Sequence, residues 1–136
     1  MAGSPFFARI KAHVLEVTAA VPPGRVLCLT DLADWLDVPP RHAAYILSQL
    51  TAEEQLAVPW HRVVPATGIV SPTRISHHGI PQRAMLADEG ITAAPSGKLD
   101  LFAQVRIRIE DLPLALPRQH RPADAPAGAP RRRRRA

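Results

Sequence analysis

Apolar residues near the amino end recur at the spacing of an α-helix. Between residues 5 and 17 they fall on every third or fourth position, which aligns them in one stripe along a helix of about four turns. The stripe consists of Phe6, Ile10, Val14 and Val17. Ser4 followed by Pro5 is typical of a helix start, with a capping hydroxyl and then proline at the first helical position. We therefore predict a helix from Pro5 that ends at the turn over residues 21–24.

Two shorter amphipathic stretches follow this helix. In residues 30–36 the apolar side chains face one way and the aspartates the other, which predicts a short helix with Thr30 as its N-cap. The break at Val38-Pro39-Pro40 ends that helix and starts a third one at Pro40 or Arg41. The third helix has an apolar face of Ala43, Ile46, Leu47 and Leu50. Two short helices around a tight turn favour a helix-turn-helix.

The second half of the chain contains patterns typical of β-structure. Val63-Val64 and Ile69-Val70 flank the turn-forming residues 65–68, which predicts a β-hairpin. Apolar residues and arginines alternate over 105–109, as they would in a half-buried edge strand. The expected fold class is therefore mainly α with short β-hairpins.

A last helix and a tail complete the chain. Residues 82–89 predict a helix that ends at Gly90, a residue suited to the left-handed position after a helix. From Pro113 onward proline, alanine and arginine dominate, and such a composition cannot bury a core. We expect one domain over residues 1–112 and a disordered basic tail over 113–136.

The net charge of +5 is concentrated in this tail. Seven of the 17 basic residues but only one of the 12 acidic residues lie from Pro117 onward, so the remainder is close to neutral. The domain would need a local basic patch to contact DNA, and the tail is a separate positively charged segment that could bind it.

No stretch approaches the roughly 20 apolar residues that span a bilayer, so we expect no membrane partner. The single cysteine, Cys28, excludes an internal disulfide and a thiolate-rich zinc site and favours a cytoplasmic location.

The most informative motif is the run Val58-Pro59-Trp60-His61-Arg62-Val63-Val64. It resembles the Pro-Cys-His-Arg-Val active-site motif of O6-alkylguanine-DNA alkyltransferases, with tryptophan in place of the nucleophilic cysteine. A thiolate accepts an alkyl group because it is a soft, ionisable nucleophile. An indole has no ionisable atom and only a weak N–H donor. The motif therefore implies a pocket for an alkylated base without the transfer chemistry.

Segments on both sides of the motif resemble the same family in register. They lie at 23–26 and 32–33 upstream, and at 70–71, 75–76, 82, 86 and 88–90 downstream. Over residues 5–110 the chain resembles the alkyltransferase-like proteins, small DNA-damage sensors with tryptophan at the cysteine position. The resemblance implies a winged helix-turn-helix-like alkyltransferase C-terminal domain.

In that family an arginine at the start of the third helix enters the base stack while the alkylated guanine rotates into the pocket. An ungapped count back from the motif puts Ala43 at this position, whereas a two-residue shortening puts Arg41 there. Buried apolar residues follow the family's arginine at +2 and +6. From Arg41 these positions are Ala43 and Leu47, and from Ala43 they are Tyr45 and Gln49. Burying an unpaired glutamine costs roughly 1–3 kcal/mol, so we assign Arg41 as the intercalating arginine.

The resemblance assigns two sets of site residues. The expected lesion pocket comprises Pro59, Trp60, His61, Arg62, Ser71, Arg74, Ser76 and Glu89. The expected DNA-binding surface comprises Thr30, Arg41, His42 and Tyr45. His61 and Glu89 resemble the base and carboxylate of the active enzymes, and without a thiol we expect them to form a buried hydrogen-bonded pair. Arg62 contacts either backbone carbonyls or phosphate, and Ser71 and Ser76 either donate to the base edge or cap turns.

Two positions depart from the family pattern. Leu29 stands where the family usually has a tyrosine, so it has no hydroxyl for a target phosphate. Thr73 occupies the register of a loop arginine that contacts the alkylated base in some members, and Arg74 follows it. The pair His77-His78 lacks a second ligand cluster, which favours a solvated loop over a metal site.

These residues together predict a non-enzymatic DNA-damage recognition protein. It would bind double-stranded DNA containing O6-alkylguanine as a monomer, without cofactor or metal. The base would flip into a pocket beside Trp60. The resemblance alone implies that the site would then be flagged for nucleotide excision repair. The alternatives are a winged-helix transcription regulator without lesion specificity, an interaction module, and an active methylated-DNA cysteine methyltransferase. The last would have to use Cys28, which lies in an apolar run without an adjacent base.

Overall fold

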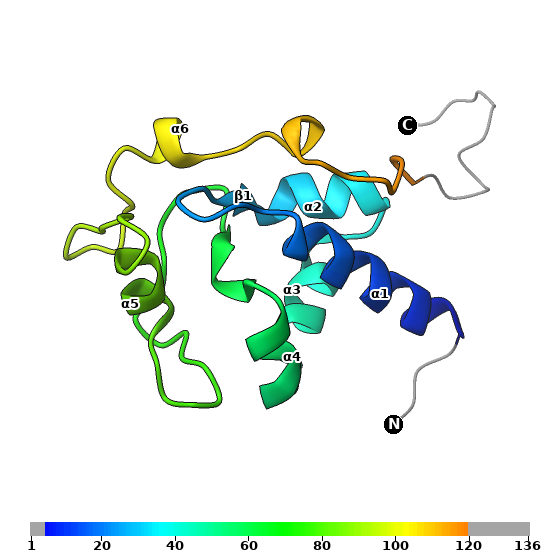
Figure 1. Ribbon diagram of the computed structural model, residues 1–136, viewed down its shortest axis with the longest axis horizontal. Coiled ribbons are helices and arrows are strands. Elements are labelled where there is room, and N and C mark those ends of the chain that lie inside the picture. The colour runs from blue at the N-terminus through cyan, green and yellow to red at the C-terminus, as the bar shows by residue number, and fades with distance from the viewer. Residues whose placement is uncertain (1–4, 120–136) are drawn as a thin grey trace.

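Three helices form the larger part of the core in the computed structural model, which describes residues 5–119. They are α1 (Pro5–Ala19), α2 (Leu29–Leu36) and α3 (Pro40–Ser48), and α2 and α3 both pack against α1 (Figure 1). The predicted first and third helices are confirmed. Ile10, Val14 and Val17 are buried, but Phe6 is exposed because the first turn of α1 extends beyond the core. The expected cap Ser4 lies outside the described residues.

The start of α2 differs from the sequence-based expectation. Thr30 lies inside the helix, and the N-cap is Cys28, which has no capping side-chain hydrogen bond. The reason is that Cys28 is the last residue of strand β1 (Leu27–Cys28), so the chain passes directly from an extended strand into the helix. The prediction of Thr30 as the N-cap is wrong.

A short parallel sheet replaces the predicted hairpin. Strand β2 (Val63–Val64) pairs with β1, with Leu27 opposite Val63 and Cys28 opposite Val64. Ile69 instead forms an isolated antiparallel bridge with Lys98. The apolar pair at 63–64 is buried on both faces, and such a run fits a parallel strand inside the molecule better than one arm of an exposed hairpin.

The predicted edge strand over 105–109 is also wrong. Val105 ends α6 (Phe102–Val105), and Ile109 begins the 3₁₀ helix η2 (Ile109–Asp111). Only Arg106 makes a β-bridge, to Val26. The alternation of apolar residues and arginines nevertheless predicted burial correctly, since Ile107 and Ile109 are buried whereas Arg106 and Arg108 are exposed.

The segment after Leu112 continues along the domain surface. The Trp35 indole N–H donates to the Leu116 carbonyl at 3.2 Å, and the Gln119 N–H donates to the Trp35 carbonyl at 2.7 Å. Contacts of the domain therefore extend to Gln119, seven residues beyond the boundary that we expected at 112. The rest of the predicted disordered tail, residues 120–136, lies outside the described residues.

Three further elements follow the helical core along the chain, and of these α5 lies on the other side of the sheet from α1 (Figure 1). They are α4 (Ala52–Ala57), η1 (Trp60–Arg62) and α5 (Gln82–Ala87). The predicted helix at 82–89 is present but two residues shorter, and Gly90 follows with a positive φ of 87°. A second buried cluster lies here, formed by Val26, Val64, Val70, Leu86, Ile91 and Leu99. Within the described part of the chain, no helix is long and apolar enough to cross a membrane.

Candidate functional site

The Trp60-His61-Arg62 motif forms one turn of 3₁₀ helix, η1, directly before β2. Pro59 precedes it as the N-cap, and its fixed ring leads the chain into the turn. Trp60 belongs to the large hydrophobic cluster built from the first three helices, whereas η1 also contacts α5. The turn η1 therefore lies between the helical core, into which Trp60 packs, and α5.

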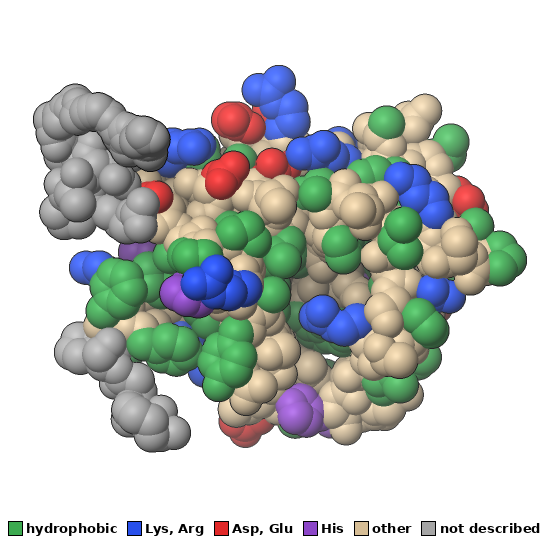
Figure 2. Space-filling view, turned by 180° about the vertical axis from the view of Figure 1, so that it is seen from behind, with side chains coloured by type: hydrophobic (Ala, Val, Ile, Leu, Met, Phe, Trp, Pro, Cys, Tyr) green, Lys and Arg blue, Asp and Glu red, His purple; other side chains and the backbone are tan. Residues whose placement is uncertain are grey.

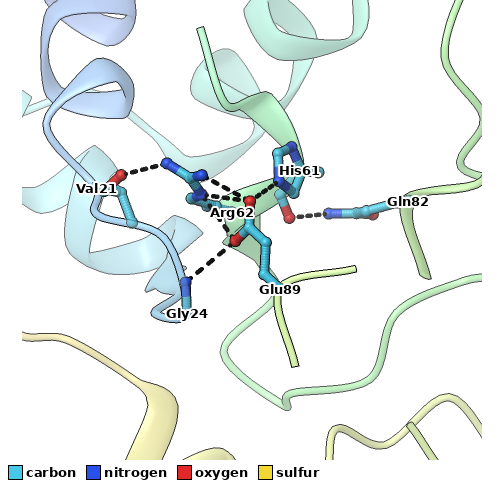
Figure 3. Close-up of polar contacts among 6 residues, drawn as sticks. All are labelled: Val21, Gly24, His61, Arg62, Gln82 and Glu89. Atoms are coloured by element: carbon cyan, nitrogen blue, oxygen red, sulfur yellow. Dashed lines mark hydrogen bonds and ion pairs between the residues drawn. The ribbon is translucent and has the colours of Figure 1, made fainter. Parts of the chain in front are cut away.

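His61 and Arg62 converge on the carboxylate of Glu89, just beyond α5 (Figure 3). Arg62 Nη2 lies 2.6 Å from Glu89 Oε2, and its Nε lies 3.0 Å from both carboxylate oxygens. His61 Nε2 lies 2.8 Å from the same Oε2. The expected pair of His61 and Glu89 is confirmed, but the double contact from Arg62 was not predicted.

The network also fixes the loop between α1 and β1. Arg62 Nη1 donates to the Val21 carbonyl at 2.8 Å, as one of the two expectations for Arg62 stated. The Gly24 N–H donates to Glu89 Oε1 at 3.2 Å. Burial raises the pKa of Glu89, but hydrogen bonds from Arg62, His61 and the Gly24 N–H outweigh it and lower that pKa from 4.5 to about 2. The carboxylate is therefore ionised at neutral pH and ties three segments together.

Gln82 is a site residue to which sequence reasoning gave no role. Its buried side-chain amide donates to the carbonyls of His61 and Val63, at 3.0 and 3.1 Å. These bonds hold η1 against the start of α5. A polar residue on the inner face of a predicted helix was the signal that could have identified it, because buried amides are placed where they find partners.

A cavity of about 130 Å³ opens beside Trp60. Its lining comes from α3, α4, η1 and the loop before α5, and consists of Leu47, Ser48, Gln55, Trp60, Thr73, Arg74 and Ile75. Of the expected pocket residues, Trp60 and Arg74 line it. Trp60 is buried, and its Nε1 has no hydrogen-bond partner among residues 5–119.

The two serines expected at the pocket both stabilise turns. Ser76 Oγ accepts hydrogen bonds from the N–H groups of His78 and Ile80, each at 3.1 Å. Ser71 Oγ accepts the Thr73 N–H at 3.2 Å and shares a 2.8 Å hydrogen bond with Thr73 Oγ1. Of the alternatives stated for Ser71 and Ser76, the structure shows the turn-capping one.

Helix α3 presents Arg41 on the side of the cavity. Arg41 is exposed at the second position of the helix, whereas Ala43 is completely buried. Ala44 and Ser48 follow Arg41 at +3 and +7 on the same helix face, and Ser48 lines the cavity. The periodicity used to choose Arg41 is thus reproduced, since Ala43 and Leu47 are buried while Tyr45 is exposed.

The other residues expected to contact DNA lie elsewhere. His42 and Tyr45 line an apolar groove of about 350 Å³ between α3 and the first turns of α1. Thr30 is half-buried in α2. Leu29, the departure from the family tyrosine, lines a small recess of about 30 Å³ that it shares with Arg74. Arg41 and Tyr45 share the face of α3 that continues to Ser48, and none of the four residues expected to contact DNA lines the cavity itself.

The environment of Cys28 does not favour a role as a nucleophile. The thiol is fully buried in β1, and burial raises its pKa, an effect that nearby Arg106 only partly offsets. A buried thiol with a raised pKa is a poor nucleophile at neutral pH. In the part of the chain that the structure describes, His77-His78 and the other potential ligands form no cluster able to hold a metal ion.

Comparisons with known proteins agree with this architecture. The family model described as 6-O-methylguanine DNA methyltransferase, DNA binding domain, matches residues 9–91. DNA base-flipping proteins of Escherichia coli (strain K12) and Shigella flexneri are each 34% identical over 91 residues, covering 65% of this chain and 67% of theirs.

Two solved structures share the fold. S. pombe Atl1 in complex with damaged DNA containing O6-carboxymethylguanine gives a TM-score of 0.61 at 24% identity, over 74% of this chain and 96% of that one. S. pombe ATL in complex with DNA gives 0.58 at 24% identity, over 79% and 99%. The chain belongs to the 6-O-methylguanine DNA methyltransferase DNA-binding-domain family, and the expected alkyltransferase-like fold is confirmed.

Proposed function

We propose that this protein recognises O6-alkylguanine in double-stranded DNA by flipping the base into the cavity beside Trp60, without transferring the alkyl group. The observation that carries the proposal is the cavity itself, which Trp60 lines. The motif resemblance puts Trp60 at the position of the alkyltransferase cysteine. An aromatic wall favours a stacked or packed base by roughly 1–3 kcal/mol. Relatives named DNA base-flipping proteins support the same function.

The chemistry of the site supports binding without catalysis. The chain has one cysteine, which is buried in β1, and the cavity is lined by no thiol. His61 is engaged by Glu89 in the network behind Trp60. Alkyl transfer needs an ionisable nucleophile beside the bound base, and the residues that line the cavity supply none.

Arg41 is the residue proposed to fill the gap left by the flipped base. Flipping costs a few kcal/mol of lost stacking and pairing, so a side chain in the stack lowers the population of the closed duplex. Arg41 is exposed on the face of α3 that continues to Ser48 and the cavity. On the face seen in Figure 2, basic side chains lie near the middle as well as along the edges, whereas acidic ones lie towards the edges. The basic side chains near the middle are available for contact with phosphates.

The finer steps rest on the resemblance to alkyltransferase-like proteins. We propose that the protein acts as a monomer on DNA in the bacterial nucleoid or its equivalent, and that the bound site is passed to nucleotide excision repair. Copurification of repair proteins with the complex on lesion-containing DNA, but not with the free protein, would support the transfer.

The direct test compares one oligonucleotide duplex that contains either O6-methylguanine or guanine at the same position. The proposal predicts at least tenfold tighter binding to the methylated duplex. It also predicts that the lesion is still intact after release of the protein, as measured by mass spectrometry of the DNA. Equal affinities would favour a transcription regulator, and loss of the methyl group would favour an active methyltransferase.

A further inference from the structure

The polar groups that line the Trp60 cavity are dominated by hydrogen-bond donors. Gln55 and Arg74 contribute N–H groups, and no aspartate or glutamate is among the lining residues. The Arg74 guanidinium has no ion-pair or hydrogen-bond partner within the described chain. A cavity with several donors and an uncompensated cation favours a ligand rich in acceptors or carrying negative charge.

The orientation of the Gln55 amide is fixed by a backbone group. Gln55 Oε1 accepts the His77 N–H at 2.8 Å, and an N–H donor can only be met by the oxygen end of the amide. The two hydrogens on Nε2 have no partner in the described residues. Gln55 therefore offers donors, not an acceptor, to the cavity that it lines.

The position of Gln55 is held from both sides. It lies on α4, whose first turn is closed by a reciprocal capping box between Thr51 and Glu54. Lys11 of α1 forms a 2.9 Å ion pair with Glu54. The His77 side chain in turn lies 2.7 Å from the Leu50 carbonyl, which anchors the loop that binds Gln55. A donor fixed in this way loses little conformational entropy when it binds a ligand.

The hydroxyl groups in the lining do not reverse this polarity. The Ser48 hydroxyl donates to the Tyr45 carbonyl at 2.6 Å, and Thr73 Oγ1 shares its hydrogen bond with Ser71. A buried water occupies at least roughly 10–15 Å³ of such a cavity, so about 130 Å³ admits a group of several non-hydrogen atoms.

From these donors we propose that Gln55 is a specificity-determining residue, and that with Arg74 it makes the cavity selective for O6-alkylguanines whose alkyl group ends in a carboxylate. This inference rests on the proposed function, since it places the flipped base against Trp60. The carboxylate would accept hydrogen bonds from Gln55 Nε2 and the Arg74 guanidinium. An apolar substituent of equal size would leave both groups desolvated and unpaired.

The test measures binding of the full chain to duplexes containing O6-carboxymethylguanine, O6-isobutylguanine or guanine. Carboxymethyl and isobutyl groups have the same number of non-hydrogen atoms, so they differ in charge and polarity rather than size. We expect the carboxymethyl duplex to bind about tenfold more tightly than the isobutyl duplex, as a charge-assisted hydrogen bond implies. Added salt should reduce that preference because Arg74 is exposed.

Gln55→Glu is the sharpest variant. Its carboxylate can still accept the His77 N–H, so the loop contact is kept, but the donors are replaced by negative charge. The preference for carboxymethyl should disappear or invert while isobutyl binding changes less than threefold. Arg74→Gln should reduce the preference to about twofold, and Arg108→Gln, which removes an exposed cation outside the cavity lining, should leave it unchanged.

The outcomes separate the two proposals. If both alkylated duplexes bind no better than guanine, the proposed function fails. If both bind better than guanine but equally well, the function stands and the role of Gln55 is overturned. An unchanged preference in Gln55→Glu would also overturn it.

Discussion

The two sides of η1 differ in how their polar groups are satisfied. Behind the turn, Arg62 and Glu89 form a partly buried network in which the carboxylate accepts hydrogen bonds from three residues (Figure 3). In front of it, Trp60 faces a cavity whose donors, on Gln55 and Arg74, have no partner within the described chain. Satisfied polar groups stabilise the fold, whereas unsatisfied donors beside a cavity are available to a ligand.

This difference explains what can remain of an alkyltransferase site when the cysteine is absent. His61 and Glu89 keep a structural use, because together with Arg62 they connect the α1–β1 loop to the end of α5. In the proposed function, Trp60 stands where the resembling motif has its nucleophile. The same three-residue turn would then separate a stabilising function from a binding function, and each side can be changed alone.

Loss of Arg62 should give the largest effect on stability. Arg62→Met leaves the Glu89 carboxylate without its strongest partner, and breaking a buried ion pair costs about 3–5 kcal/mol. Urea unfolding of the variant and of Arg74→Met measures the contrast, because the exposed Arg74 should change stability by less than about 0.5 kcal/mol. Equal destabilisation by the two variants would contradict the division between the two sides.

Acid should weaken the network before it affects the cavity side. The pKa of Glu89 is about 2 in the folded protein and near 4.5 when unfolded, so its contribution is complete above pH 4.5 and is lost as the pH falls towards 2. The difference corresponds to about 3 kcal/mol at neutral pH. The melting temperature of Glu89→Gln should depend less on pH in this window than that of the unsubstituted protein. Equal pH dependence of the two melting temperatures would contradict a stabilising role of the Glu89 carboxylate.

On the cavity side, Arg41→Ala should affect binding and leave folding intact. Lesion binding should weaken more than tenfold, about 1.4 kcal/mol, because the flipped state loses the side chain that fills the stack. The control is Arg108→Ala, which removes the same charge from an exposed position outside α3 and the cavity lining. If both variants bind equally well, the two-residue shortening that put Arg41 at the position of the family's arginine is wrong.

The smallest effect concerns the support of Gln55. Thr51→Ala removes the capping hydroxyl of α4 and should cost about 1 kcal/mol. Thr30→Ala is the matched control, since Thr30 does not cap α2 and its loss should change stability by less than about 0.5 kcal/mol. The denaturant midpoints of the two variants measure this difference. A larger loss of stability in Thr30→Ala than in Thr51→Ala would mean that Thr30 has a role absent from the structure.

The helices could be predicted from the sequence, but the sheet could not. Periodic apolar residues identified α1 and α3, because one helix face must be buried. Strands β1 and β2 have two residues each and lie far apart in the chain, so their pairing leaves no local pattern. Val63-Val64 therefore looked like a hairpin arm, although parallel pairing with Leu27–Cys28 takes its place.

The site was predictable where a motif carries it and not where separate segments meet. Trp60 and the contact of His61 with Glu89 followed from the resemblance. The lining of the cavity combines α3, α4 and the loop before α5, and that assembly depends on tertiary packing. Gln55 was missed for this reason, although the capping box of Thr51 and Glu54 could have located its helix.

Fluorescence of Trp60 tests the central claim most directly. The chain has two tryptophans, so Trp35→Phe leaves Trp60 as the only reporter at the cavity. The variant is titrated with duplexes containing O6-methylguanine or guanine. A base packed against the indole should change the emission with the methylated duplex at saturation and leave it nearly unchanged with guanine. The same change with both duplexes, or none with the methylated duplex when it is bound, would contradict base flipping into the Trp60 cavity.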